Sequence, residues 1–175
     1  MLALQTTLAS LGFWLGELDG NYAHLTQQAV MAFQKANGLA RDGIAGPQTL
    51  AALAGATRPL PAVVTDGIEI DLERQLILVV SGGQTVHVLN TSTGRSGWRT
   101  PRGDFAINRQ IDGMRHAPLG DLWRPKYFTG GIAVHGSSSI PGQPASHGCA
   151  RLSMAAMDML WSSGLAEMGT RVVVY

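Results

Sequence analysis

The side chains best suited to covalent chemistry lie near the end of this sequence, around a single cysteine. Cys149 is the only thiol in 175 residues and stands in the run Ser146-His147-Gly148-Cys149-Ala150-Arg151, called here the cysteine segment. An apolar stretch ends at His135-Gly136, and a loop rich in Ser, Gly and Pro joins it to this segment. A thiol with an imidazole base within hydrogen-bond distance is the minimal site for covalent acyl transfer. The pattern indicates such a site, with a buried structural cysteine and an unrelated histidine as the alternative.

Other side chains near this pair are candidates for binding a substrate. Arg151 carries a planar guanidinium that suits either a substrate carboxylate or a structural ion pair. Trp123 and Tyr127 precede the stretch that ends at His135, and their rings suit either a substrate groove or the core. The chain from Arg95 to Lys126 contains seven basic and three acidic residues. That excess indicates either a cleft for a carboxylate-bearing ligand or a solvated surface.

A zinc hydrolase is the nearest alternative to thiol chemistry. His135, His147 and Cys149 could supply three zinc ligands. No Asp or Glu lies between Asp121 and Asp158, however, so these loops offer neither a carboxylate ligand nor a general base. We therefore expect no metal and no cofactor. A papain-like peptidase is a further alternative, but there the cysteine precedes the histidine in the chain, and here the order is reversed.

Composition and charge exclude several classes of protein. Hydrophobic residues make up 45% of the chain and charged residues 14%, which argues against intrinsic disorder. The formal net charge of +1 argues against a strongly basic nucleic-acid binder. The longest apolar runs have five residues, whereas a membrane span needs about 20. We expect a monomer that binds no nucleic acid and has no membrane span.

The first third of the chain predicts three short helices. A leucine stripe over residues 4–11 predicts the first. Thr26 is expected to cap the second helix, whose apolar face runs over residues 29–36. Pro47 suits the first turn of the third helix, with Leu50 facing inward.

An internal repeat underlies these helices. Asp19-Gly20 precedes Thr26 by the same spacing with which Asp42-Gly43 precedes Thr49. In each unit an Asp-Gly turn, where glycine permits a positive φ, leads into a helix.

Beyond a proline-bearing linker at residues 56–64, the hydrophobic pattern changes to a period of two. Strands are expected near residues 68–72, 76–80, 85–89, 105–107, 132–135 and 171–175, with a hairpin turn at Gly82-Gly83. One helix follows a cap at Ser153. We therefore expect two domains. They are a small all-α domain at residues 1–55 and a mainly β sandwich or barrel with one helix at residues 65–175.

The first domain resembles the peptidoglycan-binding repeat carried by many cell-wall enzymes. The matching residues are Leu4-Gln5, Leu8, Leu11-Gly12-Phe13, Leu18-Asp19-Gly20, Thr26, Ala29-Val30, Phe33-Gln34, Gly38-Leu39, Asp42-Gly43-Ile44, Gly46-Pro47 and Thr49-Leu50. The resemblance implies a three-helix fold that binds peptidoglycan. A helical packing module without a tight ligand is the alternative.

The second domain is similar to the catalytic domain of the L,D-transpeptidases. The matching residues are His135-Gly136 and the cysteine segment, together with Ile70-Asp71-Leu72, Gln75-Leu76, Gly83, Ser92-Thr93-Gly94 and Thr100 to Phe105. The likeness runs from about Ile68 to Tyr175. It departs from the family at Ala150, where Ile or Val is usual, which removes a contact in the core.

The resemblance implies a role for each residue of the motif. Cys149 would be the nucleophile and His135 its base, with the carbonyl of Gly136 orienting the imidazole. The backbone N–H groups of His147, Gly148 and Cys149 would stabilise the oxyanion. The expected contacts to substrate are Ser146, Arg151, Tyr127 and Trp123.

The implied reaction is cleavage of the bond before the terminal D-alanine of a peptidoglycan tetrapeptide stem, through a thioester acyl-enzyme. An amine of a neighbouring stem would then form a 3→3 cross-link, whereas attack by water would give L,D-carboxypeptidase activity. The sequence leaves both outcomes open. A wall-binding protein with an inactive enzyme domain is a further alternative, and the presence of both Cys149 and His135 counts against it.

The implied partners are peptidoglycan stem peptides and glycan, and carbapenems are expected to acylate the same thiol. We expect a location in the cell wall, the periplasm or outside the cell. No basic region precedes an apolar stretch at Met1, so either the protein stays inside the cell or an export signal has been trimmed. Wall chemistry favours the exported location.

Overall fold

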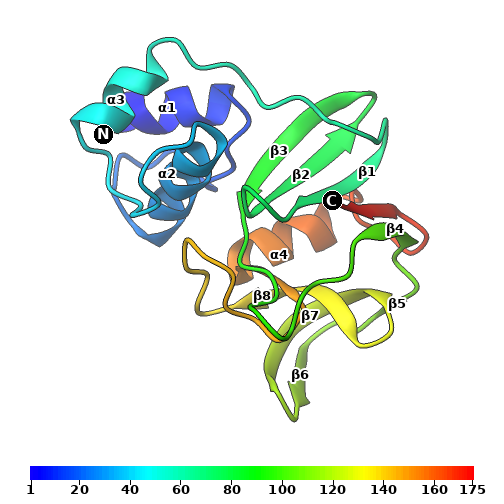
Figure 1. The fold of residues 1–175 in the computed structure, drawn as a ribbon. Helices are drawn as coiled ribbons and strands as arrows, with labels where there is room; N and C mark the ends of the chain where they lie inside the picture. The colour runs from blue at the N-terminus through cyan, green and yellow to red at the C-terminus, as the bar shows by residue number, and fades with distance from the viewer.

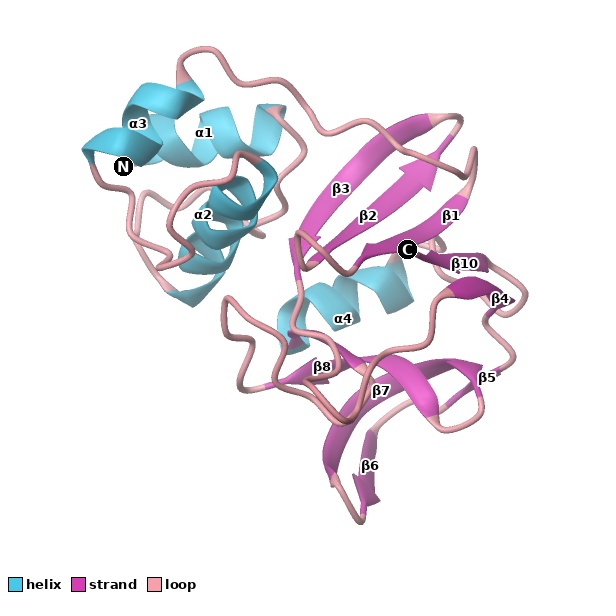
Figure 2. Ribbon diagram, in the orientation of Figure 1, coloured by secondary structure: helices cyan, strands magenta, loops and turns pink.

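The computed structural model describes all of residues 1–175, a helical domain followed by a β domain (Figures 1 and 2). The helical domain contains α1 (Leu2–Ser10), α2 (His24–Ala36) and α3 (Pro47–Leu53). The β domain contains, in chain order, β1 (Gly67–Asp71), β2 (Leu76–Ser81), β3 (Gln84–Asn90), β4 (Gly103–Ala106), β5 (Arg109–Gln110), β6 (Met114–Ala117), β7 (Gly120–Thr129), β8 (Ile132–Ser137), β9 (Ala150–Ser153), α4 (Met154–Ser162) and β10 (Arg171–Val174). This is the predicted fold class. None of the helices has the length and apolar character that crossing a membrane requires.

The second helix begins earlier than the sequence predicts. α2 starts at His24 after an N-cap at Ala23, and no side chain caps it. The predicted cap at Thr26 is therefore wrong. Thr26 is buried in the first turn, where its hydroxyl accepts a hydrogen bond from Gln5 Nε2 at 3.0 Å and donates to the carbonyl of Asn21. The hydrogen bond with Gln5 keeps the Thr26 hydroxyl inside the helical domain, so it does not cap the helix.

The internal repeat corresponds to two equivalent turns, each fixed by a buried glutamine. Gln5 Nε2 donates to the carboxylate of Asp19 at 2.9 Å, and Gln5 Oε1 accepts a hydrogen bond from the N–H of Gly20 at 2.7 Å. Gln34 makes the same two bonds to Asp42-Gly43, at 2.7 and 2.8 Å. Both turn glycines have a positive φ, +76° and +69°, as the Asp-Gly pattern predicts.

The inward face of α3 differs from the prediction. Pro47 occupies the first turn as expected, but Leu50 is 50% exposed and its neighbour Thr49 is buried. Gln34 Nε2 donates to the Thr49 hydroxyl at 3.1 Å, which fixes this threonine on the inner face. Because successive helical residues face about 100° apart, Leu50 then points outward.

Two sheets form the β domain. The first has the order β3-β2-β1-β10-β4, with β1 and β10 parallel and the other pairs antiparallel. The second has the order β5-β7-β8-β9, with β8 and β9 parallel and β6 paired to β7. The predicted turn joins β2 to β3, and Gly82 and Gly83 both have positive φ, as a type I′ turn requires. Strands β5, β6, β7 and β9 are not among the predicted elements.

Helix α4 lies between the two sheets (Figure 2). Its predicted cap is confirmed, because the Ser153 hydroxyl accepts a hydrogen bond from Ala156 N–H at 3.1 Å. Met157 and Leu160 are fully buried in a core formed with both sheets. This packing holds β8 and β9, which carry the candidate site, against the first sheet.

The helical domain shares a second core with the β domain. Phe13 and Phe33 pack with Leu78 and Val88 of the first sheet in one buried cluster. The backbone of Val88, on the edge strand β3, donates to Gly12 at 2.8 Å and accepts from Trp14 at 3.2 Å. The helical domain therefore continues both the core and the hydrogen bonding of the sheet.

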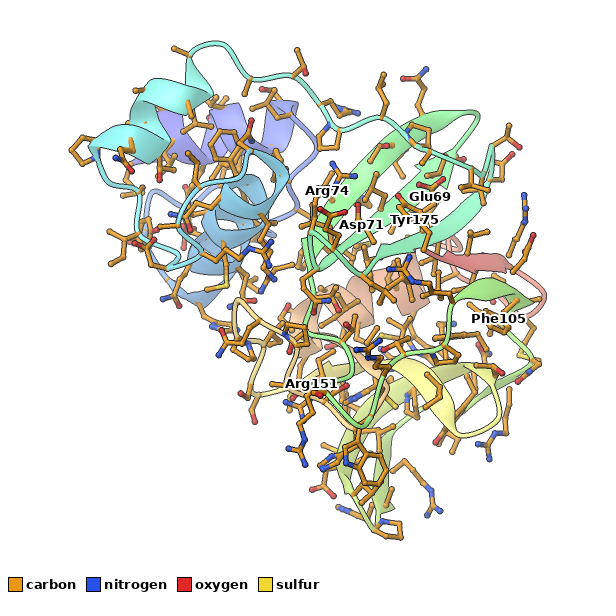
Figure 3. All side chains as sticks on the ribbon, in the orientation of Figure 1. Glu69, Asp71, Arg74, Phe105, Arg151 and Tyr175 are labelled. Atoms are coloured by element: carbon orange, nitrogen blue, oxygen red, sulfur yellow. The ribbon has the colours of Figure 1, made fainter.

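The linker is held by a buried carboxylate. Glu69, fully buried on β1, accepts hydrogen bonds from the backbone N–H groups of residues 62–64 at 2.6 to 3.1 Å. The hydroxyl of Tyr175 donates to Glu69 Oε2 at 3.0 Å, and Figure 3 shows the two side chains together. These bonds fix the linker against the first sheet, so that it is not a free tether.

Candidate active site

A cavity of about 890 Å³ lies beside the second sheet, bounded by the β6–β7 hairpin, β8 and the cysteine segment. Cys149, His135, Arg151 and Tyr127 all line it. The parallel pairing of β8 with β9 sets His135 opposite Arg151, which places Cys149 immediately before the paired strand. In Figure 3 Arg151 lies well apart from Glu69 and the other labelled residues of the first sheet. Strand pairing thus brings together the residues that the sequence pattern selected.

The imidazole of His135 is held in one orientation. Its Nδ1 lies 2.9 Å from the carbonyl oxygen of Gly136, the partner that the family resemblance implies. An N–H at Nδ1 donates to this carbonyl, so the neutral ring keeps Nε2 as its acceptor. Nε2 has no hydrogen-bond partner within the protein, and the side chain is 5% exposed.

Burial controls the protonation of both groups. It lowers the pKa of His135 to about 4, opposed by the Gly136 hydrogen bond and assisted by the positive charge of Arg151. It raises the pKa of Cys149, opposed by a backbone hydrogen bond from Ala133 and by Arg151. At neutral pH the pair is therefore a thiol and a neutral imidazole. The thiol lies 3.8 Å from the carbonyl of Gly131 and makes no hydrogen bond to His135.

The cysteine segment is folded around the hydroxyl of Ser146. This hydroxyl donates to the carbonyl of Cys149 at 2.6 Å and accepts from Gly148 N–H at 3.0 Å. Of the three expected oxyanion donors, the N–H of Gly148 therefore already has a partner within the protein. The N–H groups of His147 and Cys149 make no bond within the protein. Ser146 is 2% exposed, and both hydrogen bonds of its hydroxyl lie within the segment, although the residue borders the cavity.

His147 lines the cavity and forms no hydrogen bond with His135. Its Nε2 accepts a hydrogen bond from Arg95 Nη2 at 2.8 Å, and its ring meets Trp98 edge-on at 5.0 Å. No three His, Cys, Asp or Glu side chains in the chain converge closely enough to hold a metal ion. The ligand set of the zinc alternative is therefore not assembled.

Three of the four expected substrate contacts border the cavity, and besides Ser146 these are Arg151 and Tyr127. The guanidinium of Arg151 makes neither an ion pair nor a hydrogen bond, so it is free to meet a carboxylate. Tyr127 is buried beneath the cavity, with the guanidinium of Arg109 3.7 Å from its ring centre. The structural ion pair considered for Arg151 is not formed.

The second aromatic candidate lies behind the site. Trp123 does not line the cavity, and its indole N–H donates to Asp158 of α4 at 2.8 Å. Its ring covers Gly136, where an added Cβ would lie 2.8 Å from Trp123 Cδ1. Trp123 therefore supports the residue whose carbonyl orients His135.

Several site residues are not predicted from the sequence. The mouth of the cavity carries four exposed apolar side chains, which are Trp98, Met114, Leu119 and Met154. Thr100, whose hydroxyl donates to the Gly148 carbonyl at 2.7 Å, belongs to a run that the family resemblance includes. The four apolar residues give no local signal, because Trp98 in a loop, Met114 and Leu119 in the β6–β7 hairpin, and Met154 in α4 meet at the site only in the folded chain.

Two family models match the chain. A model described as a peptidoglycan binding domain matches residues 1–53. The model of the L,D-transpeptidase catalytic domain matches residues 65–174, and therefore more than half of the chain.

Solved structures show the same relationship. The chain is similar to an L,D-transpeptidase from Xylanimonas cellulosilytica, with 52% identity, a TM-score of 0.94, and coverage of 99% of this chain and 92% of that one. It is also similar to an L,D-transpeptidase from Stackebrandtia nassauensis, with 26% identity, a TM-score of 0.62, and coverage of 99% and 89%.

Curated relatives match over shorter stretches. An N-acetylmuramoyl-L-alanine amidase, CwlM, from Mycobacterium tuberculosis is 48% identical over 50 residues, 29% of this chain. The amidase CwlL from Bacillus licheniformis is 48% identical over 64 residues, 34% of this chain. The chain spans only 12% and 18% of the length of these two relatives. On the catalytic-domain match and the similarity to the Xylanimonas structure, the chain belongs to the L,D-transpeptidase family and carries a peptidoglycan binding domain before its catalytic domain.

Proposed function

We propose that this protein is a cysteine acyltransferase that cleaves the bond before the terminal D-alanine of a peptidoglycan tetrapeptide stem and forms 3→3 cross-links. The observation that carries the proposal is the shared cavity of Cys149 and His135, in which His135 Nε2 is left free as a base. Membership of the family supports the substrate class.

Acylation begins with proton transfer within a neutral pair. Nε2 of His135 takes the proton of the Cys149 thiol as sulfur attacks the stem carbonyl carbon. The N–H groups of His147 and Cys149, unbonded within the protein, are the available donors to the oxyanion. The carbon–nitrogen bond then breaks, and the imidazolium returns its proton to the leaving D-alanine amine. The product of this half-reaction is a thioester on Cys149.

Deacylation reverses these roles. An amine of a neighbouring stem attacks the thioester carbonyl, gives its proton to His135 and releases the Cys149 thiolate, which recovers a proton from the imidazolium. Attack by water instead would release a tripeptide. The free guanidinium of Arg151 is suited to hold a stem carboxylate during both steps.

The helical domain supplies the second contact with the substrate. We propose that it binds peptidoglycan glycan or stem peptides, as the family model at residues 1–53 indicates. The protein would then act as a monomer in the cell wall, the periplasm or outside the cell.

The thioester can be tested directly by mass spectrometry of the intact protein. We expect the wild type, mixed with a disaccharide-tetrapeptide and quenched in acid, to gain the mass of the substrate less one D-alanine. Cys149→Ala should fold normally and show no adduct, because the nucleophile is absent. An adduct of that mass on Cys149→Ala would contradict the assignment of the nucleophile.

A further inference from the structure

The helical and β domains meet at a buried lysine that has no acidic partner. Lys35 of α2 is 1% exposed and forms no salt bridge. Its Nζ donates to the carbonyl oxygen of Thr91 at 2.8 Å and to that of Gln75 at 3.1 Å. Both acceptors are buried residues of the β domain. An amine buried without an anion is costly, so these two hydrogen bonds are its compensation.

Thr91 is the first residue of a segment, Thr91–Gly94, that hydrogen-bonds to the cysteine segment; we call it the supporting segment. The Thr91 hydroxyl donates to the carbonyl of Arg151 at 2.8 Å. Ser92 accepts from the N–H of Arg151 at 3.1 Å, and the Thr93 carbonyl accepts from Ser146 N–H at 3.0 Å. The supporting segment therefore holds both ends of the cysteine segment.

Gln75 reaches the same segment through its side chain. Its Nε2 donates to the Thr93 hydroxyl at 2.7 Å and its Oε1 accepts from Thr93 N–H at 2.8 Å. Gln75 has a φ of +60°, a conformation uncommon for a residue with a side chain. Lys35 therefore contacts the two residues from which the support of the cysteine segment begins, and all the linking side chains are buried.

The amine can make both bonds whether or not it is charged. Burial, with a smaller contribution from the positive charge of Arg41, lowers the pKa of Lys35 to about 7. A neutral amine retains two N–H groups, one for each carbonyl. A methionine of similar length would fill the same space but would leave the Thr91 carbonyl without a donor.

We propose that Lys35 is a positioning residue for the Cys149 site, so that the helical domain takes part in the geometry of the reaction as well as in binding the wall. Lys35 fixes the supporting segment, and the supporting segment fixes the cysteine segment. The effect on turnover rests on the proposed function, whereas the effect on the cysteine segment does not.

The test uses the full chain with Lys35→Met, and Lys126→Met as a matched control. Lys126 is also a 1% exposed lysine, but its amine donates to Gln110, lies over the ring of Trp161 and makes no hydrogen bond to either segment. In Lys35→Met we expect the amides of Ser146 and Arg151 to exchange hydrogen about tenfold faster. For tetrapeptide turnover we expect kcat to fall about ten- to hundredfold with KM little changed. Lys126→Met should show neither effect.

A second variant keeps the test decisive where Lys35→Met does not fold. Thr91→Val removes only the hydroxyl that bonds Arg151, and it should give the same pattern of exchange and kcat. Unchanged exchange and unchanged kcat in a folded Lys35→Met or Thr91→Val would overturn the proposal, as would an equal loss of kcat in Lys126→Met. The two proposals can also fail separately. If the variants exchange faster but the wild type does not turn over the tetrapeptide, the result supports the positioning role and contradicts the proposed function.

Discussion

His135 is almost fully buried and Cys149 is partly buried, and burial shifts the pKa values of the two groups in opposite directions. The pKa of the thiol is raised and that of the imidazole is lowered to about 4. Both shifts favour the neutral forms over a thiolate–imidazolium pair in the free protein. The ion pair would then form only as the thiol proton is transferred during attack on the substrate.

This protonation can be tested with the free protein. The rate of Cys149 alkylation by iodoacetamide should rise with pH through a midpoint above the ordinary thiol pKa, because only the thiolate reacts. A pre-formed ion pair would instead give fast alkylation from about pH 5 upward, and that profile would contradict the account. The variant Cys149→Ala, which has no thiol, measures the background alkylation of other residues.

At the scale of single residues, the sequence predicted the members of the site better than their contacts. Cys149 and His135 are recognisable because each sits in a motif whose chemistry depends on residue type. Trp123 was expected in the substrate groove, but its indole N–H finds Asp158 across the domain. Gly148 was expected as an oxyanion donor, but the Ser146 hydroxyl accepts its N–H. Such pairings depend on which buried groups meet after folding, which local sequence does not specify.

At the scale of elements, the orientation of the base depends on how β8 packs against β7 and α4. Gly136 on β8 is covered by Trp123 of β7, and an added Cβ would also lie 3.1 Å from Met154 Cα of α4. The carbonyl that orients His135 belongs to this glycine. The absence of a side chain at Gly136 therefore lets the three elements pack closely behind the base.

Gly136→Ala tests this packing. We expect a loss of about 1–3 kcal/mol in stability, since the ring or the helix must move to admit a methyl group, and a fall in kcat as His135 shifts. Thermal melting and turnover would measure the two effects. Gly55→Ala, at a position with no atom within 4 Å of the added Cβ, is the control. Wild-type stability and kcat in Gly136→Ala would contradict this explanation.

The helices and strands that the sequence predicts correctly are those with a clear hydrophobic period or a capping residue. Residues 76–80 lie in β2 because the run is uniformly apolar, and Ser153 caps the start of α4. The longest strand, β7, was not predicted because it contains Arg124-Pro125-Lys126, which reads as a turn. Arg124 has a φ of +47°, and the pairing of β7 with β8 is irregular there. The strand is stabilised by neighbours on both sides and not by its own sequence pattern.

At the scale of the whole molecule, the two domains share one of the hydrophobic cores. Phe13 and Phe33 pack directly with Leu78 and Val88, and β3 hydrogen-bonds to the chain after α1. The composition of residues 56–64 predicts a linker between two domains but not the core that they share. This core forms because the outer face of β2 and β3 is apolar and is buried by the helical domain.

Shared burial predicts cooperative unfolding. Calorimetry of the intact protein should show a single transition, because separating the domains would expose the apolar residues of both. Two separate transitions would contradict a common core. The variant Val88→Asp, which places a charge between the domains, should lower the midpoint of the whole transition.

The titration of Lys35 should make the stability of the protein depend on pH. Its folded pKa of about 7 lies below the ordinary value of 10.5. The unfolded chain therefore binds more protons between these values, so this group makes stability rise with pH from about 7 to about 10.5. Urea unfolding of the wild type and Lys35→Met across this range measures the difference. The wild type should gain stability relative to the variant as pH rises, and parallel curves would contradict the lowered pKa.

The central claim, cross-linking by a cysteine acyltransferase, is tested most directly by mass spectrometry of the products formed from a purified disaccharide-tetrapeptide. We predict a dimer whose mass is that of two substrates less one D-alanine, formed by the wild type and not by Cys149→Ala. A tripeptide monomer alone would retain the thiol chemistry but contradict cross-linking. Unchanged tetrapeptide, after incubation with folded protein carrying a free thiol, would contradict the claim as a whole.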